Sequence, residues 1–253
     1  MSGHSKWSTI KRKKGAQDAK RGRIFTRLMR EITVAARMGG GDPNGNPRLR
    51  TAIEAAKAQN MPKDNIERAI KKGTGELEGV AYEEVIYEGY GPGGVAFLIE
   101  CLTDNKNRAA SEVRHILSKR GGSMAKAGAV AYLFEAKGYI VFDKDGLDED
   151  QIMEAALEAG ADDIKDGGDV WEVYCAPGDF NQVLEGLKGA GLEPSQAEVT
   201  KLPTTTVSIT DPDEARKVLA LAEALDEADD VQNVYSNFDI DDQILASLAE
   251  GGK

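Results

Sequence analysis

Apolar residues recur at helical spacing early in the chain. One run places its apolar side chains on a single helical face, while Arg23, Arg27 and Arg30 fall on the opposite face. This pattern predicts an amphipathic helix that begins near residue 24 and ends at the sequence GGGDPNG, residues 39–45. The apolar positions of this face are Ile24, Phe25, Leu28, Met29, Ile32 and Ala36.

Two shorter helices are expected to follow. Asn46 is a suitable N-cap, and Pro47 presets the first turn of the second helix. The third helix is expected over residues 62–72, with Gly73 as its end. Residues 1–22 lack apolar periodicity and are expected to form a basic arm or a loosely held helix. Residues 1–75 are therefore predicted to be a small three-helix domain.

Beyond residue 75 the pattern alternates between strands and helices. Strands are expected on both sides of the turn sequence GYGPGG, residues 89–94, and a helix follows over about 108–120. Residues 137–200 have the order βαββαβ, which is typical of a ferredoxin-like unit. A strand, a helix and a strand complete the chain at 205–209, 212–226 and 231–236.

These elements predict an α+β fold in which a three-helix domain precedes two ferredoxin-like modules, one inserted in the other. The expected domains are a helical one at 1–75, an α+β one at 76–136 plus 201–240, and an inserted one at 137–200. Residues 241–253 are expected to be a C-terminal tail.

The charge of the chain is divided unevenly between these parts. Residues 1–75 carry 18 Lys and Arg against 6 Asp and Glu, whereas residues 76–253 carry 14 against 37. Because an acidic surface repels phosphate, any contact with nucleic acid is expected to be confined to the basic part.

The basic part therefore supplies the candidate nucleic-acid-binding residues. Lysine and arginine neutralise phosphates, which gives affinity but little choice of sequence. Trp7 either stacks on an unpaired base or packs on the helical domain. No recognition-helix or zinc-finger pattern specifies a groove. The candidates are Lys6, Trp7, Lys11, Arg12, Lys13, Lys14, Lys20, Arg21, Arg23, Arg27 and Arg30.

The residues that carry catalysis or bind metals form no convincing group. The histidines are His4 and His115, and neither has an evident partner; Cys101 and Cys175 each end an apolar strand and are expected to be buried thiols. The acidic stretch 162–169 is better explained as a solvated loop than as a metal site. The sequence thus predicts a protein that is not an enzyme and that has no catalytic residue, metal or cofactor.

One polar cluster, residues 104–108 (DNKNR), lies between a strand and a helix. Helix capping explains it adequately, and a binding loop is the alternative.

No apolar run approaches the roughly 20 residues that span a bilayer, and the basic N-terminus lacks the apolar stretch of a secretory signal. We therefore expect a cytoplasmic protein with no membrane partner.

Several motifs, in order, resemble those of the YebC/PmpR family. They are GHSKW at 3–7, AQDAKRG at 16–22, NPRLR at 46–50, YEGYGPGG at 87–94 and AYLF at 131–134. The resemblance covers the helical domain and the first α+β module strongly, and the tail more loosely. It implies three domains, a helical one followed by two α+β ones.

The resemblance also implies a role in gene expression. Members of the family are described as probable transcriptional regulators that bind DNA. Similar mitochondrial proteins act as translational activators, and bacterial relatives are linked to stalled ribosomes. DNA is therefore the expected partner, and the ribosome with its RNA is the alternative; the acidic modules would then face basic ribosomal proteins.

Overall fold

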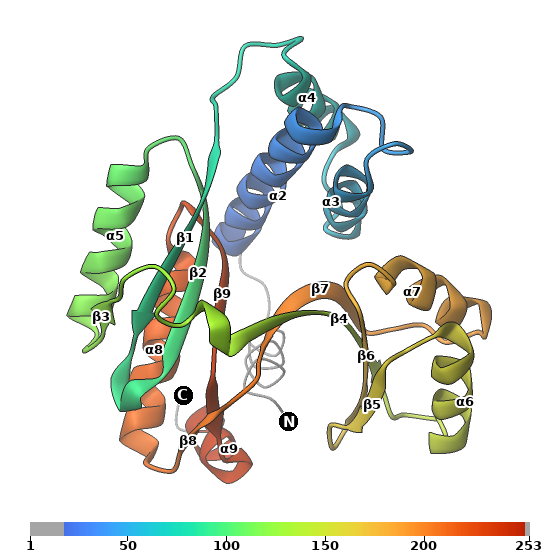
Figure 1. Ribbon diagram of the computed structural model, residues 1–253, viewed down its shortest axis with the longest axis vertical. Helices are drawn as coiled ribbons and strands as arrows, with labels where there is room; N and C mark the ends of the chain where they lie inside the picture. Colours follow the sequence, from blue (N-terminus) through green and yellow to red (C-terminus); the bar gives the residue numbers. More distant parts are fainter. Residues whose placement is uncertain (1–17, 251–253) are drawn as a thin grey trace. The chain divides into compact units, whose positions relative to one another are not determined.

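The computed structural model of the protein describes residues 18–250, and describes side chains at 22–241, 243–245, 247 and 248 (Figure 1). The fold is mixed α+β, as the sequence predicted, with N-terminal helices followed by two four-stranded sheets and one two-stranded sheet in the described part of the chain. The described chain forms two compact units. Residues 18–129 with 216–234 make the first unit, and residues 130–215 with 235–250 make the second. The expected helical domain and the strands that follow it thus belong to the same unit.

Three helices open the first unit: α2 (Asp18–Gly39), α3 (Pro47–Ala58) and α4 (Lys63–Thr74). Their apolar faces meet in a core that includes Ile32, Leu49 and Ile66. Asn46 caps α3 as predicted, because its side-chain oxygen accepts a hydrogen bond from Leu49 N at 3.1 Å. The helix α2 starts earlier than expected, since the chain is already helical at residue 18.

The end of α4 differs from the prediction. The helix continues through Gly73, and Gly75 adopts the left-handed conformation that ends it, with φ 85°. Gly73 instead permits a close approach to α2, because a Cβ at this position would lie 2.4 Å from Thr33 O and 2.7 Å from Ala36 Cβ.

The sheet of the first unit has the strand order β3 (Ser123–Met124), β1 (Glu83–Tyr90), β2 (Ala96–Thr103) and β9 (Val231–Ser236). The strands β1 and β2 form an antiparallel hairpin around the short 3₁₀ helix η1 (Pro92–Gly94). The helices α5 (Lys106–Lys119) and α8 (Pro212–Glu227) pack on one face of the hairpin. An added Cβ at Gly89 would lie 2.9 Å from both Leu117 of α5 and the main-chain oxygen of Ser123, and at Gly91 it would lie 2.6 Å from the Phe97 ring and 2.8 Å from Leu221 of α8, so the two glycines permit close packing here.

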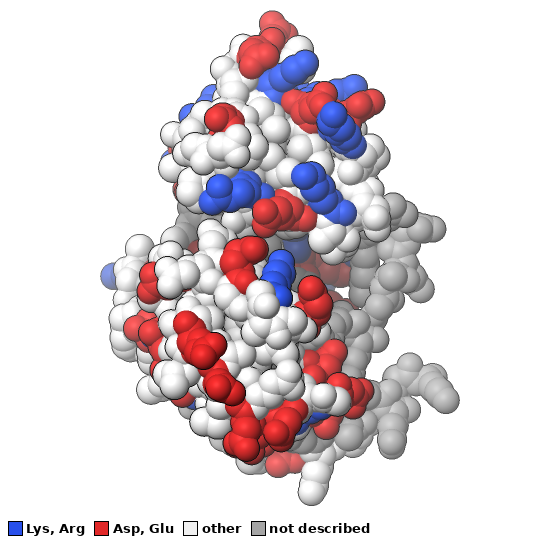
Figure 2. Space-filling view, turned by 90° about the vertical axis from the view of Figure 1, so that its right-hand side faces the viewer, with Lys and Arg blue, Asp and Glu red and all other residues white. Residues whose placement is uncertain are grey.

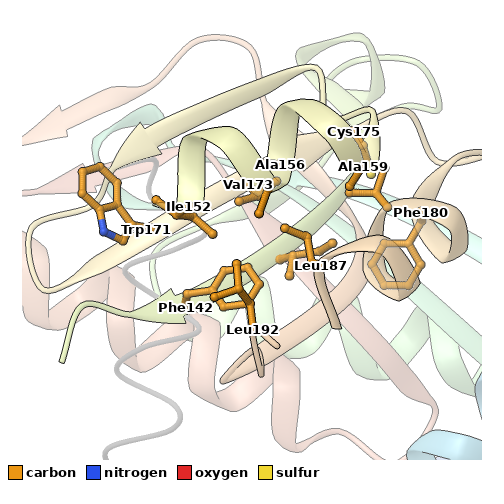
Figure 3. Close-up of a cluster of buried hydrophobic side chains, with 13 residues drawn as sticks. Phe142, Ile152, Ala156, Ala159, Trp171, Val173, Cys175, Phe180, Leu187 and Leu192 are labelled. Atoms are coloured by element: carbon orange, nitrogen blue, oxygen red, sulfur yellow. The ribbon is translucent and has the colours of Figure 1, made fainter. Parts of the chain in front are cut away.

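The second unit contains the predicted βαββαβ arrangement: β4 (Phe134–Asp143), α6 (Glu149–Ala159), β5 (Asp163–Asp166), β6 (Val170–Cys175), α7 (Phe180–Gly189) and β7 (Gln196–Pro203). The strand order β5-β6-β4-β7, with every pair antiparallel, is that of a split ferredoxin-like sheet. The side chains between the sheet and its two helices form a closed apolar core that includes Phe142, Ile152 and Leu187 (Figure 3).

The rest of the second unit consists of short elements. The 3₁₀ helix η2 (Ala131–Leu133) precedes β4, and β8 (Val207–Ile209) pairs in parallel with β10 (Phe238–Ile240). The expected C-terminal tail contains a helix, α9 (Asp242–Glu250). None of the described helices is long and apolar enough to cross a membrane.

Candidate nucleic-acid interface

Only part of the predicted interface can be placed. Lys6, Trp7, Lys11, Arg12, Lys13 and Lys14 lie outside the described residues. Lys20 and Arg21 belong to α2, but their side chains are outside the described part of the chain. The geometry of the site therefore rests on Arg23, Arg27 and Arg30, together with the exposed cations of the other helices.

The arginines of α2 face an acidic run within their own unit. Arg23 Nη2 lies 3.0 Å from Glu227 Oε1, and Arg27 Nη1 lies 3.2 Å from Asp226 Oδ1. Arg27 also donates a hydrogen bond to the main-chain oxygen of Asp226. The exposed fraction of the side chain falls from 36% at Arg23 to 16% at Arg27. This cationic face is thus largely covered by the protein itself.

The C-terminal end of α8 is strongly acidic, which explains why the arginines of α2 form these ion pairs. Its sequence, DEADD at 226–230, places acidic side chains where the helix dipole is already negative, and its last turn has no basic residue. The final carbonyl groups of a helix also lack partners within the helix. The arginines of α2 neutralise the acidic run, and Arg27 satisfies one of these carbonyl groups.

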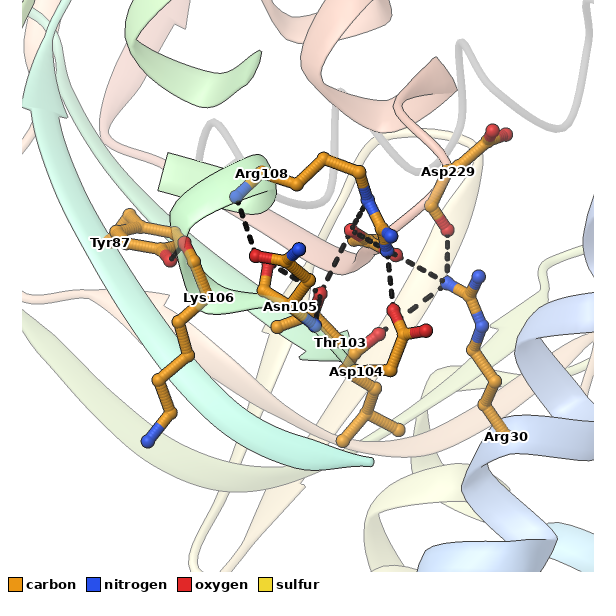
Figure 4. Close-up of polar contacts among 10 residues, drawn as sticks. Arg30, Tyr87, Thr103, Asp104, Asn105, Lys106, Arg108 and Asp229 are labelled. Atoms are coloured by element: carbon orange, nitrogen blue, oxygen red, sulfur yellow. Dashed lines mark hydrogen bonds and ion pairs between the residues drawn. The ribbon is translucent and has the colours of Figure 1, made fainter. Parts of the chain in front are cut away.

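Asp230 is the most buried member of this group, with 3% of its side chain exposed. Figure 4 shows the polar contacts of Arg30, Thr103 and Arg108 in this region. Arg30 Nη1 lies 3.3 Å from its Oδ1, and Arg108 Nη2 lies 2.8 Å from its Oδ2. Thr103 Oγ1 donates a hydrogen bond to Oδ2 at 2.9 Å, and the main-chain oxygen of Asp230 accepts from Leu102 N. This carboxylate therefore connects α2, the end of β2 and the start of α5.

The polar cluster at 104–108 has the predicted capping role. Asn105 is the N-cap of α5, and its side-chain oxygen accepts from Arg108 N at 3.1 Å. The Arg108 guanidinium also donates to Asp104 at 2.6 Å, and this hydrogen bond holds the pKa of the Asp104 carboxyl below its usual value. The cluster thus serves both the helix and the Asp230 network.

Other cations of the helical segment stay exposed. They have no ion-pair partner among the described residues, except that Lys63 lies 3.5 Å from Glu67. Figure 2 shows Lys and Arg gathered with a few acidic residues on the helical segment in its upper part. The charge balance of residues 1–75 indicated this surface, although the predicted binding residues end at Arg30. The exposed cations are Arg37, Lys57, Lys63, Arg68, Lys71 and Lys72.

The cysteines and the acidic stretch that were weighed as catalytic or metal-binding residues are buried or paired within the fold. Cys101 and Cys175 are buried, and burial raises the pKa of their thiols to about 12 and about 11, so neither is a reactive thiolate. Asp166, from the acidic stretch 162–169, pairs with Lys144 at 2.6 Å. Within the described part of the chain, no group of three metal-ligating side chains comes together.

Comparison with known proteins identifies the family. The description "TACO1/YebC protein N-terminal domain" matches residues 5–76, and "TACO1/YebC second and third domain" matches residues 82–238. The chain belongs to the TACO1/YebC family. This result confirms the resemblance seen in the sequence motifs.

Relatives within the TACO1/YebC family are similar over almost their whole length. A probable transcriptional regulatory protein of Desulfatibacillum aliphaticivorans is 63% identical over 97% of this chain and 99% of its own. One from Syntrophobacter fumaroxidans is 59% identical over 98% of this chain and 100% of its own. The crystal structure of a conserved hypothetical protein from Aquifex aeolicus is 52% identical, with a TM-score of 0.81, over 90% of this chain and 94% of that one.

Proposed function

We propose that this protein is a non-enzymatic regulator of gene expression that binds DNA through phosphate contacts from its basic helical segment. The observation that carries the proposal is the set of exposed cations on α3 and α4, which lack ion-pair partners among the described residues apart from Lys63. The names of the relatives, probable transcriptional regulatory proteins, support the choice of DNA.

In this proposal the cations of α2 and those of α4 have different tasks. Arg27 and Arg30 hold α2 against the end of α8 and the residue before β9, and so orient the helical segment within its unit. Arg68, Lys71 and Lys72 are exposed on α4 and are available to neutralise phosphates. Phosphate contacts position a protein on a duplex but carry little sequence information, so the affinity is expected to depend weakly on sequence.

Binding to DNA is tested by its salt dependence. The change Arg68→Gln with Lys71→Gln removes two of the proposed phosphate contacts, and we expect the slope of log affinity against log salt to fall by about 2. The matched control is Lys188→Gln with Lys217→Gln, which removes the same charge from exposed positions elsewhere. An unchanged slope for the α4 variant, or an equal fall for the control, would refute the contact on α4.

The second candidate is a ribosome-associated translation factor that contacts ribosomal RNA. The acidic surface favours it: α6 exposes Glu149, Asp150, Glu154 and Glu158, and acidic side chains predominate in the lower part of Figure 2. Such a surface suits basic ribosomal proteins, while the cationic helices suit RNA.

Sucrose-gradient sedimentation of gently lysed cells, with and without ribonuclease, separates the two candidates. Migration with ribosomes that the change Lys11→Glu with Arg12→Glu abolishes would favour translation and place the contact in the N-terminal segment. A protein that stays at the top of the gradient would favour DNA.

A further inference from the structure

The helix α5 and the loop after it gather positive charge within the acidic part of the chain. Residues 76–253 carry 14 Lys and Arg, and six of these lie between residues 106 and 126. Glu112 is the acidic residue of that stretch. The six cations are Lys106, Arg108, Arg114, Lys119, Arg120 and Lys126.

The packing of α5 separates this charge from its apolar side. Ala109, Val113 and Leu117 are buried and hold one face of α5 against the sheet, where Gly89 allows Leu117 a close approach. The opposite face is polar and exposed along the whole helix. It consists of Asn107, Ser111, Arg114, His115, Ser118 and Lys119.

The internal ion pairs account for only some of these cations. Arg108 is committed to Asp104 and Asp230, and Lys106 pairs with Glu83. No ion pair with another described residue occupies the remaining four: Arg114, Lys119, Arg120 and Lys126.

The helix dipole explains a further part of the charge. Cations at the C-terminal end of a helix are stabilised by the dipole, which is a sufficient reason for Lys119 and Arg120. It gives no reason for Arg114, which lies in the middle of α5, or for Lys126, which lies beyond the helix. These positions carry exposed positive charge that the fold itself does not need.

We propose that the exposed face of α5 is a second DNA-binding surface, which contacts the phosphates of a duplex. Arg114 would neutralise a phosphate. Lys119 would neutralise a second one, because the dipole favours its charge but no acidic side chain of the described residues pairs with it. The Ser111 and Ser118 hydroxyl groups and the Asn107 amide are further donors of the kind that bind phosphate oxygens.

The chemistry of the face favours a duplex over a single strand. Its one aromatic ring is the His115 imidazole, and it has no Trp, Tyr or Phe side chain on which successive unpaired bases would stack. The 14-residue helix is about 21 Å long, and a duplex offers one phosphate charge per roughly 1.7 Å of its axis, so the face can meet several phosphates. This surface rests on the proposed function, because DNA is its ligand, and extends it beyond the helical segment.

The test uses the complete chain, a fluorescent duplex and a series of salt concentrations. In one variant, Arg114→Gln and Lys119→Gln remove two of the proposed contacts; the control is Lys188→Gln with Lys217→Gln, which lowers the net charge equally. We expect the α5 variant to bind the duplex more weakly by about tenfold or more, with a salt slope lower by about 2. The control should bind like the unaltered protein. The melting temperatures of the two variants should fall by a similar small amount, because each variant loses one cation from the last turn of a helix, Lys119 in α5 and Lys188 in α7.

The outcomes separate this surface from the proposed function. If the unaltered protein binds the duplex and the α5 variant keeps the same slope, the α5 surface is refuted while the proposed function stands. An equal loss in the control would attribute the effect to net charge and would also refute the surface. The same variants are also tested with a ribosomal RNA fragment as a second probe. If the α5 variant loses binding to that fragment alone, duplex DNA is refuted as the ligand of the α5 surface. If the unaltered protein binds no duplex, the proposed function itself fails.

Discussion

The arginines of α2 and the cations of α5 belong to the same unit but have different surroundings. Arg27 and Arg30 are largely buried, with 16% and 14% of their side chains exposed, and each pairs with an acidic residue near the end of α8. Arg114 and Lys119 are exposed on α5 and have no such partner among the described residues. Both helices are amphipathic and basic, so the difference comes from what the fold places opposite each cation.

This contrast shows that a basic helical face does not by itself identify a binding surface. A fold that contains an arginine facing a buried carboxylate depends on both partners, because removing either one leaves an unpaired buried charge. An arginine that faces water contributes little to stability and remains available to a polyanion. Substitutions in the two helices should therefore separate stability from binding.

The largest effect is expected from Asp230→Ala. This change removes the acceptor that Arg30, Arg108 and Thr103 share and leaves two cations near a buried site. We therefore expect the free energy of unfolding to fall by about 3–5 kcal/mol. Urea denaturation followed by circular dichroism measures this free energy. Asp229→Ala is the control, because its side chain is exposed and its backbone oxygen, which accepts from Arg30, is retained. Equal destabilisation by the two changes would contradict a specific role for the Asp230 carboxylate.

A direct comparison of the two helices comes from Arg27→Gln and Arg114→Gln. Arg27→Gln removes charge-assisted hydrogen bonds to Asp226 and should cost about 1.5–3 kcal/mol of unfolding free energy. Arg114→Gln should change it by no more than about 0.5 kcal/mol, because the side chain is exposed. Thermal unfolding of both variants provides the measurement. The comparison fails if the change in α5 destabilises the protein as much as the change in α2.

Within α2 the loss of stability on replacing an arginine should become smaller toward the N-terminal end of the helix. Arg23 pairs with Glu227, and 36% and 47% of the two side chains are exposed. A surface ion pair of this kind contributes about 0–1 kcal/mol, and salt screens it. Arg23→Gln should therefore lower the melting temperature slightly at low salt and hardly at all at high salt. A loss as large as that of Arg27→Gln, and independent of salt, would contradict the gradient.

Much of this fold followed from local patterns. The βαββαβ unit was predictable because each strand and helix of 137–200 has its own periodicity and turn residues, and Asn46 with Pro47 marks the start of α3. The end of α4 was predicted wrongly at Gly73, because the close approach to Thr33 is a tertiary contact that no local pattern shows. The pairing of β9 with β2 likewise joins segments far apart in the sequence.

The candidate site was less predictable for the same reason. The cationic face of α2 was evident from the spacing of Arg23, Arg27 and Arg30, but their partners lie about 200 residues further along the chain. The run DEADD at the end of α8 was a usable indication, since acidic residues at a helix C-terminus need neutralisation from elsewhere. Residue counts over long segments also concealed the basic stretch 106–126 inside the acidic part.

The smallest effect concerns Glu112, the acidic residue of α5. Burial, and then the nearby Asp230 and Asp229, raise the pKa of its carboxyl, and the Arg108 cation opposes this only in part. The folded state thus disfavours the ionised form, so this group lowers stability as pH rises from its ordinary pKa through the raised value. Glu112→Gln should slightly raise the melting temperature at pH 7, and the gain should vanish as the solution is acidified below that range. If the melting temperature rises by the same amount at pH 7 and pH 4, the rise comes from helix propensity or packing and not from the Glu112 charge. Duplex binding by α5 should not weaken in this variant.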